Sequence, residues 1–257
     1  MSDAETSVVI DEFVATVEVC RPPNNFFDQS LIEELAFVLE TLDERKECRS
    51  VVLCSRGKHF CAGANFSDSS TDPVLKTERM QGLYDAAVRM FRTKKPIVAA
   101  VQGAAIGGGL GLALTADFRV GCCESRFSAN FSQLGLHPGF GISVTLPRVV
   151  GRSNADRMLF VGNRVGGDDA LAIGLIDDLV PCDELRRAAW QLARKIASSA
   201  PLAVQAIRKT SRQELADAVE AAVEYELREQ IWLRDTDDFA EGVKAMSERR
   251  TPRFLEQ

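Results

Sequence analysis

Two stretches of small residues are the parts of this sequence best suited to chemistry. The first is FCAGANF at residues 60–66, and the second is the run of three glycines at residues 107–109. Glycine lets another molecule approach the backbone closely, and the first turn of a helix has peptide N–H groups without internal partners. Because each stretch follows an apolar segment, the two together predict a pair of backbone donors that stabilise an oxyanion.

The glycine run lies in a long uncharged stretch, residues 96–116, that admits three interpretations. A membrane span needs about 20 apolar residues, but each of the five glycines here costs about 1 kcal/mol in a helix interior. A dinucleotide-binding loop requires the spacing GxGxxG, which these glycines do not complete. A buried strand, a tight glycine turn and a buried helix fit best. Glycines that serve close packing alone remain the structural alternative.

The segments around these loops predict an α/β domain followed by helices. Asp28 is a plausible cap for the helix that follows it, and Met80, Leu83, Ala87, Met90 and Phe91 share one face of another. Residues 125–151 combine short strand-like pieces with the turn LHPGFG. Strand signals end near residue 200, so we expect domains at 1–200 and 201–257. Strands are expected within 7–20, 50–55, 96–103 and 117–122, and helices within 29–48, 110–116, 153–162, 183–199, 202–234 and 237–249.

Composition limits the classes of function. The net charge of -6 and the pI of about 5.2 argue against nucleic acid as a partner. Seven cysteines without a CxxC pair, together with only two histidines, favour reduced thiols and no metal site. The acidic beginning, MSDAETSVVIDEF, has no apolar core of a signal peptide. We therefore expect a cytoplasmic protein that does not use a membrane as a partner.

Six segments together resemble the crotonase superfamily, also called the enoyl-CoA hydratase/isomerase family. The resemblance extends from about residue 8 to residue 254. It rests on GKHFCAGANF, KKPIVAAVQGAAIGGGLGLALTADFRV, LGLHPGFGISVTLPRVVG, VGNRVGGDDALAIGLIDDLV, APLAVQAIRK and EGVKAMSERRTPRF.

This resemblance implies a crotonase-like spiral of repeated β-β-α units with a C-terminal α-helical oligomerisation region. It implies a homotrimer or a dimer of trimers that acts on an acyl-CoA thioester. No separate cofactor is expected, because coenzyme A is part of the substrate. By motif position, the two N–H groups that stabilise a thioester enolate would belong to Ala64 and Gly108.

The sequence departs from the family at the acid–base positions. The two glutamates of the hydratases align with Gly111 and Phe131, and the turn at residues 137–140 carries no acid. Hydration needs an acid and a base near the β-carbon, so the reaction stays open between hydration, isomerisation, decarboxylation and thioester hydrolysis. A non-catalytic acyl-CoA binder and a structural trimer without a ligand are the remaining alternatives.

Several side chains are candidates for the missing roles. An imidazole can carry a proton near neutral pH, so His137 is the first candidate for a proton carrier. Four other residues are weaker candidates, because a structural role explains each of them more simply than a catalytic one. They are Asp68 as a substrate-facing acid, His59 as a second histidine, Cys61 as a thiol nucleophile, and Asp117. The residues expected to bind substrate are Arg21, Lys58, Ala62, Gly63, Asn65, Gly107, Phe131 and Phe140, and Arg249, Arg250 and Phe254 are candidates for a coenzyme A on a neighbouring subunit.

Overall fold

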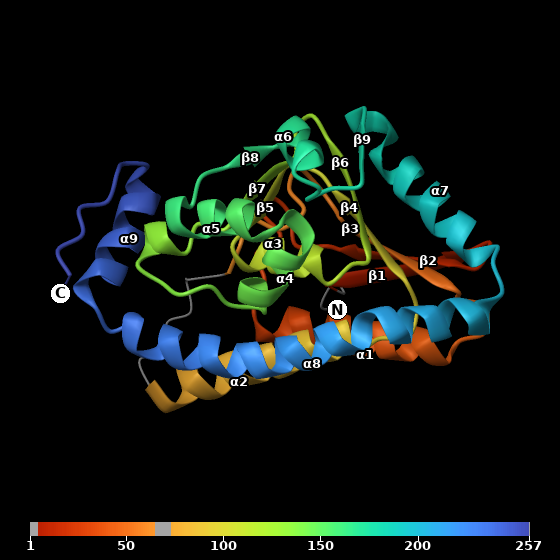
Figure 1. The fold of residues 1–257 in the computed structure, drawn as a ribbon, viewed down its shortest axis with the longest axis horizontal. Helices are drawn as coiled ribbons and strands as arrows, with labels where there is room; N and C mark the ends of the chain where they lie inside the picture. Colours follow the sequence, from red (N-terminus) through yellow and green to blue (C-terminus); the bar gives the residue numbers. More distant parts are fainter. Residues whose placement is uncertain (1–4, 65–72, 257) are drawn as a thin grey trace.

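The described strands form two sheets, as seen in a computed structural model that describes residues 5–64 and 73–256 (Figure 1). The larger sheet has the order β1-β2-β3-β4-β6-β9, and the smaller has the order β5-β7-β8. The β1–β2 and β7–β8 pairs are antiparallel, and all other pairs are parallel. The strands are β1 Thr6–Asp11, β2 Val14–Val19, β3 Ser50–Ser55, β4 Ile97–Val101, β5 Ala104–Ile106, β6 Phe118–Cys122, β7 Arg126–Ser128, β8 Val165–Gly166 and β9 Asp178–Val180.

The central strands of the larger sheet are covered on both faces. Every residue of β3 and β4 is buried, as expected for parallel strands between helices. Val52 and Cys54 pack under α7, whereas Val51 and Leu53 point to the opposite face, which α1 covers. Burial on both faces explains why these strands are apolar throughout.

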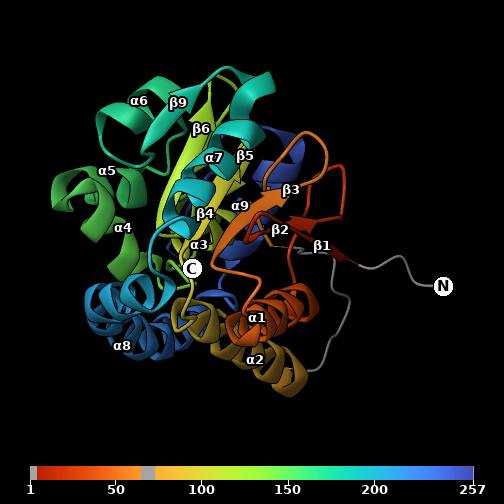
Figure 2. The same cartoon turned by 90° about the vertical axis from the view of Figure 1, so that its right-hand side faces the viewer.

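The helices form layers around the sheets. Figure 2 shows α1, α2 and α8 side by side below the larger sheet and α7 against its other face. The Oδ1 atom of Asp28 accepts a hydrogen bond of 3.1 Å from the N–H of Leu31 and caps α1, as predicted. The helices are α1 Gln29–Glu44, α2 Pro73–Phe91, α3 Gly108–Leu114, α4 Ile142–Val150, α5 Arg152–Val161, α6 Gly167–Ala172, α7 Leu185–Ala197, α8 Pro201–Leu233 and α9 Asp237–Glu248, with 3-10 turns η1 Ser132–Leu134 and η2 Cys182–Glu184.

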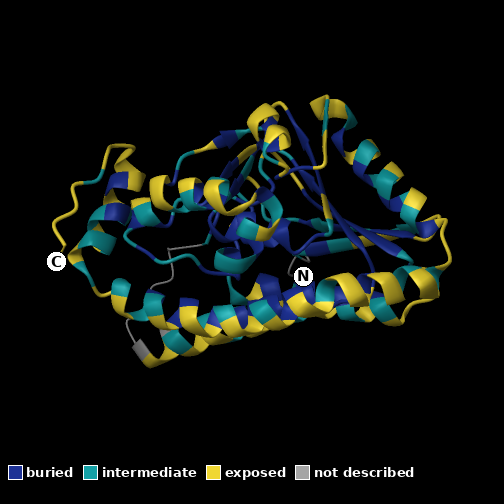
Figure 3. Cartoon of the chain, viewed as in Figure 1, coloured by how far each residue is buried: buried dark blue, intermediate teal, exposed yellow. Residues whose placement is uncertain are grey.

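The C-terminal helical region that the sequence predicts is present. It packs on the preceding part of the chain, because Val219 and Val223 of α8 share an apolar cluster with Tyr84 and Phe91 of α2. Figure 3 shows the corresponding pattern, in which α8 alternates between buried and exposed residues along its length. The boundary near residue 200 coincides with the start of α8 at Pro201; a division into two domains there stays a prediction.

The uncharged stretch at residues 96–116 is β4, then β5, then α3. The strand–turn–helix interpretation is therefore correct, and no helix in the described part of the chain is long and apolar enough to cross a bilayer. The expectation for residues 125–151 is wrong at 142–150, which form α4 although Pro147 lies inside it. Packing of Ile142 and Leu146 in the core outweighs the low helix propensity of this β-branched segment.

Candidate active site

A cavity of about 430 Å³ opens between the glycine loops, the middle of α2 and the C-terminal ends of α8 and α9. Two of its sides differ in kind. We call one side the backbone wall, formed by Ala62, Gly63, Ala64, Ile106, Gly107 and Gly108. We call the other the helical wall, formed by Met80, Leu83, Tyr84, Gln230 and Arg234. Aromatic and aliphatic side chains close the rest, including Phe27, Phe131, Leu134, Leu136 and Phe140.

Hydrogen bonds between chain segments build the backbone wall. The N–H of Cys61 donates to the carbonyl of Ala104 (2.9 Å), and the N–H of Ile106 donates to the carbonyl of Cys61 (3.1 Å). On the other side, the N–H of Phe27 donates to the carbonyl of Gly63 (3.1 Å). Residues 60–64 thus lie like a short strand between residues 24–27 and β5, which places Ala64 in the same wall as Gly108.

Glycines let these segments approach. A Cβ at Gly109 would overlap the carbonyl oxygen of Cys61, and one at Gly108 would overlap the ring of Phe27. Gly107 has φ +54, which favours glycine. Close packing is therefore one role of these glycines, because it lets the loop at residues 60–64 contact the loop at residues 107–109.

Three peptide N–H groups of the backbone wall, those of Gly63, Ala64 and Gly108, have no backbone acceptor in the described parts of the chain. Gly108 is the first residue of α3, where helical N–H groups lack internal partners. Ala64 forms a parallel bridge with Phe27, but that bridge uses the N–H of Phe27. Across residues 5–64 and 73–256, no carbonyl accepts from the N–H of either Ala64 or Gly108. Both residues line the cavity.

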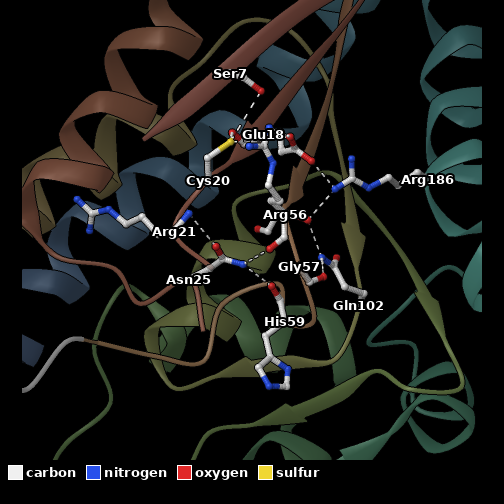
Figure 4. A network of polar contacts seen from close by, with 11 residues as sticks. Ser7, Glu18, Cys20, Arg21, Asn25, Arg56, Gly57, His59, Gln102 and Arg186 are labelled. Carbon is white, nitrogen blue, oxygen red and sulfur yellow. Dashed lines mark hydrogen bonds and ion pairs between the residues drawn. The ribbon is translucent and has the colours of Figure 1, made fainter. Parts of the chain in front are cut away.

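A polar network fixes the loop that leads to the backbone wall (Figure 4). The fully buried Asn25 donates from Nδ2 to the carbonyls of Arg56 (2.8 Å) and His59 (2.6 Å). The Nδ1 atom of His59 accepts from the N–H of Ala104 (3.1 Å). Desolvation, with the charges of Lys58 and Arg126, lowers the pKa of His59. His59 therefore has a structural role. Asn25, the last residue of the segment RPPNN, was not predicted from the sequence.

Side chains from separate helices build the helical wall. The Tyr84 hydroxyl donates to Oε1 of Gln230 (3.0 Å), and Nε2 of Gln230 donates to the carbonyl of His137 (2.8 Å). Burial raises the pKa of Tyr84 and lowers the pKa of Arg234. Tyr84, Gln230 and Arg234 were not predicted from the sequence. Tyr84 lies within the apolar stripe of α2, and no sequence pattern distinguishes Gln230 and Arg234 from the other polar residues in and after α8.

Phe140 fills the space beside Gly111. A Cβ at Gly111 would lie 2.7 Å from the Cβ of Phe140, so a larger side chain has no room there. Phe140 has φ +63 and packs edge-on against Phe27, with ring centroids 5.8 Å apart. The buried Glu226 holds the following turn, because its carboxylate accepts from the N–H of Gly141 (2.8 Å) and the hydroxyl of Ser143 (2.5 Å). Desolvation raises the pKa of Glu226.

Comparison with known proteins identifies the family. Residues 10–257 match the model of the enoyl-CoA hydratase/isomerase family. The chain belongs to the enoyl-CoA hydratase/isomerase family. It is 30% identical over 254 residues to a probable enoyl-CoA hydratase of Bacillus subtilis (strain 168), covering 96% of this chain and 97% of that protein. It is also 30% identical over 254 residues to the 1,2-epoxyphenylacetyl-CoA isomerase of Escherichia coli (strain K12), covering 95% and 96%.

Solved structures of the enoyl-CoA hydratase/isomerase family share the fold. The enzyme from Pseudoalteromonas atlantica T6c superposes with a TM-score of 0.87 at 28% identity and covers 98% of this chain and 100% of its own. The resemblance to the crotonase superfamily and the crotonase-like α/β fold with a C-terminal helical region are therefore confirmed.

The structure brings together most of the site residues expected from the family. The cavity is lined by Ala62, Gly63, Ala64, Gly107, Gly108, Phe131 and Phe140. Asn65 and Asp68 lie outside the described residues. Among the described residues that line the cavity, none is an aspartate or a glutamate.

Three expected residues do not line this cavity. The ring of His137 packs edge-on against Tyr225 at 5.7 Å, and its Nδ1 lies 2.8 Å from the carbonyl oxygen of Pro138. Arg21 pairs with Glu5 and with Asp28. Lys58 is exposed on the loop before the backbone wall. His137 therefore lies outside the described lining, and its role as a proton carrier stays a prediction.

The other sequence candidates have structural surroundings. Burial raises the pKa of the Cys61 thiol to about 12, which disfavours a nucleophile. Asp117 accepts from the N–H of Ile97 (2.8 Å) and pairs with Arg208 (2.9 Å). Near the C-terminus, Arg249 is the C-cap of α9, Arg250 pairs with Glu241 and Glu248, and Phe254 is exposed. No group of three or more potential metal ligands occurs within the residues described.

Proposed function

We propose that this protein acts on acyl-CoA thioesters and stabilises a thioester enolate through the N–H groups of Ala64 and Gly108. One observation carries the proposal: both residues line the same cavity, and neither N–H donates to a carbonyl of the described chain. Membership of the enoyl-CoA hydratase/isomerase family and the acyl-CoA names of its relatives support the substrate class.

The physical logic follows the charge that develops during reaction. When an electron pair arrives at the α-carbon of a thioester, it delocalises onto the carbonyl oxygen. Two fixed N–H donors stabilise that oxygen, and they act more strongly in an apolar cavity than in water. Phe131, Leu134, Leu136 and Phe140 make this cavity apolar, and we assign them to the acyl group.

The acid–base chemistry separates the candidate reactions. Gly111 and Phe131 stand where the resemblance places the hydratase glutamates, and Phe140 occupies the space beside Gly111. The family match supports hydratase/isomerase-type chemistry through the enolate, but these two positions have no role in proton transfer.

A decarboxylase is the second candidate, because the described lining contains the cation Arg234 and no carboxylate. In that reaction the bond between the α-carbon and a substrate carboxylate breaks. Its electron pair passes to the α-carbon and the thioester oxygen, carbon dioxide leaves, and a proton then binds the α-carbon. No carboxylate base is required for the bond-breaking step.

The resemblance also carries proposals about assembly. We assign a homotrimer or a dimer of trimers in the cytoplasm, with Arg249, Arg250 and Phe254 reaching the coenzyme A of a neighbouring subunit. Light scattering on the purified protein measures the assembly directly.

The decisive experiment removes one N–H while keeping everything else matched. Pro is tolerated at the first position of a helix, and truncation of Phe27 removes the ring that a Cβ at Gly108 would meet. Phe27→Ala/Gly108→Pro is therefore compared with Phe27→Ala/Gly108→Ala on a panel of enoyl-, 3-oxoacyl- and malonyl-type CoA esters. We expect the Pro variant to turn over the best substrate on the order of 10²–10³ times more slowly than the Ala variant.

The outcomes distinguish the alternatives. Equal rates for the two folded double variants contradict the role of the Gly108 N–H. Release of carbon dioxide from malonyl-type esters alone selects the decarboxylase. Binding of the esters without turnover by wild-type protein indicates a non-catalytic acyl-CoA binder.

A further inference from the structure

Two cysteines meet at one edge of the larger sheet, away from the residues that line the cavity. β6 ends at Cys122, so Cys123 is the first residue after it, and Cys182 begins η2 shortly after β9. The two strands are parallel neighbours, with Cys122 paired with Val180. The chain therefore leaves both strands on the same side, and this register brings Cys123 and Cys182 together.

The geometry of the two thiols is close to that of a disulfide. Their sulfur atoms lie 3.4 Å apart, and both residues are exposed. Since an S–S bond is about 2.05 Å long, the sulfurs need to approach by only about 1.4 Å. Both residues lie outside regular strands, so rotation about their side-chain bonds is not opposed by a packed core.

The remaining thiols differ from this pair. Cys48, Cys54 and Cys61 are buried, and burial raises the pKa of Cys54 to about 11 and that of Cys61 to about 12. In contrast, the thiols of Cys122 and Cys123 lower the pKa of Cys182, while contact with Cys182 raises the pKa of Cys123. Since the thiolate is the nucleophile, these opposite shifts favour Cys182 as the attacking thiol of the pair.

We propose that Cys123 and Cys182 form a peroxide-reactive dithiol that closes to an intramolecular disulfide between the ends of β6 and β9. The Cys182 thiolate attacks one oxygen of hydrogen peroxide, the O–O bond breaks, and hydroxide leaves and takes up a proton to become water. The Cys123 sulfur then attacks the resulting sulfenic acid and displaces a second water molecule. Two thiols and one peroxide thus give one disulfide and two waters.

The bridge has a defined structural consequence. It ties the short edge strand β9 to β6 and closes the chain between residues 123 and 182. Such a covalent loop restricts the unfolded chain and stabilises the folded state. It also protects two exposed thiols from further oxidation, because a disulfide does not proceed directly to sulfinic acid.

The test uses the full-length reduced protein treated with hydrogen peroxide. We expect the loss of two titratable thiols per chain, a mass lower by two hydrogen atoms, and a non-reduced peptide map in which Cys123 is joined to Cys182. The unfolding temperature of the oxidised protein should rise by several degrees, and reduction with dithiothreitol should restore the original value.

Three variants sharpen the test. Cys182→Ser should slow the loss of thiols at least tenfold, whereas Cys123→Ser should leave a single sulfenic acid at Cys182 that a dimedone probe labels. Cys20→Ser, at the partly exposed Cys20, is the matched control and should behave as wild type. Retention of both thiols by the treated wild type, a bridge between chains, or a bridge to Cys122 overturns the proposal. None of these readouts depends on turnover of acyl-CoA.

Discussion

The backbone wall presents peptide groups held by hydrogen bonds between neighbouring segments, whereas the helical wall presents side chains from α2 and α8. In the first, residues 60–64 are bonded on both sides, to residues 24–27 and to β5. In the second, Tyr84 and Gln230 meet although they are 146 positions apart in the sequence. The backbone wall is suited to stabilising a fixed charge, and the helical wall to shaping what the cavity accepts.

The comparison also shows how each wall tolerates change. In the backbone wall the limiting contact is a glycine against another main chain, as for Gly109 against Cys61. A main-chain neighbour cannot rotate away, so substitutions there should be costly. In the helical wall a side chain can change while the helix that carries it remains.

The largest effect is expected from Gly109→Ala. The added Cβ meets the carbonyl group of Cys61 and must push the two loops apart. We expect a loss of about 3 kcal/mol or more in the free energy of unfolding, measured by urea denaturation. Gly166→Ala is the control, since a Cβ there meets nothing within 4 Å. Similar urea midpoints for the two variants would show that the backbone wall is not tightly constrained.

A smaller effect is expected where α8 holds the turn behind Phe140. In Glu226→Gln the amide NH₂ group replaces an oxygen that accepts from the N–H of Gly141 or Ser143. We expect a loss of about 1–3 kcal/mol in the free energy of unfolding, because a buried donor is left unsatisfied. Glu224→Gln, on the exposed side of the same helix, should unfold like the wild type. Equal free energies of unfolding for the two variants would show that Glu226 does not stabilise this turn.

The smallest effect is a pH dependence of the backbone wall. The folded-state pKa of His59 lies below the ordinary histidine value of about 6.5, so the unfolded chain binds its proton first as the pH falls. The stabilisation from His59 is therefore present above pH 6.5 and is lost as the pH falls through the lowered pKa. Between about pH 7.5 and about pH 5.5, wild type should lose more stability than His59→Gln. Parallel stability profiles for the two proteins would contradict this assignment.

The sequence predicts the backbone wall better than the helical wall for a physical reason. A strand, a glycine run and a helix start lie close together in the chain, so residues 96–116 were interpreted correctly from local patterns alone. The same holds for Asp28 as the cap of α1. Six segments with a family resemblance then placed Ala64 and Gly108, and both line the cavity.

What the sequence did not predict depends on contacts between distant segments. From the sequence, Tyr84 is one more residue on the apolar face of α2. Only the structure shows that Gln230 accepts a hydrogen bond from its hydroxyl. The placement of the His137 ring also depends on a distant segment, because it packs against Tyr225 of α8. Residues 142–150 form α4 because the core packs around Ile142 and Leu146, although Pro147 and the β-branched residues favour other structures.

The 33 residues of α8 form one continuous helix of about 50 Å. Near its beginning Arg208 binds Asp117, just beyond the end of α3, and near its end Gln230 binds the carbonyl of His137. One helix thus contacts both the residues just beyond α3 and the rim of the cavity. Any tilt of α8 would move both contact points together, so this helix couples the region beyond α3 to the rim of the cavity.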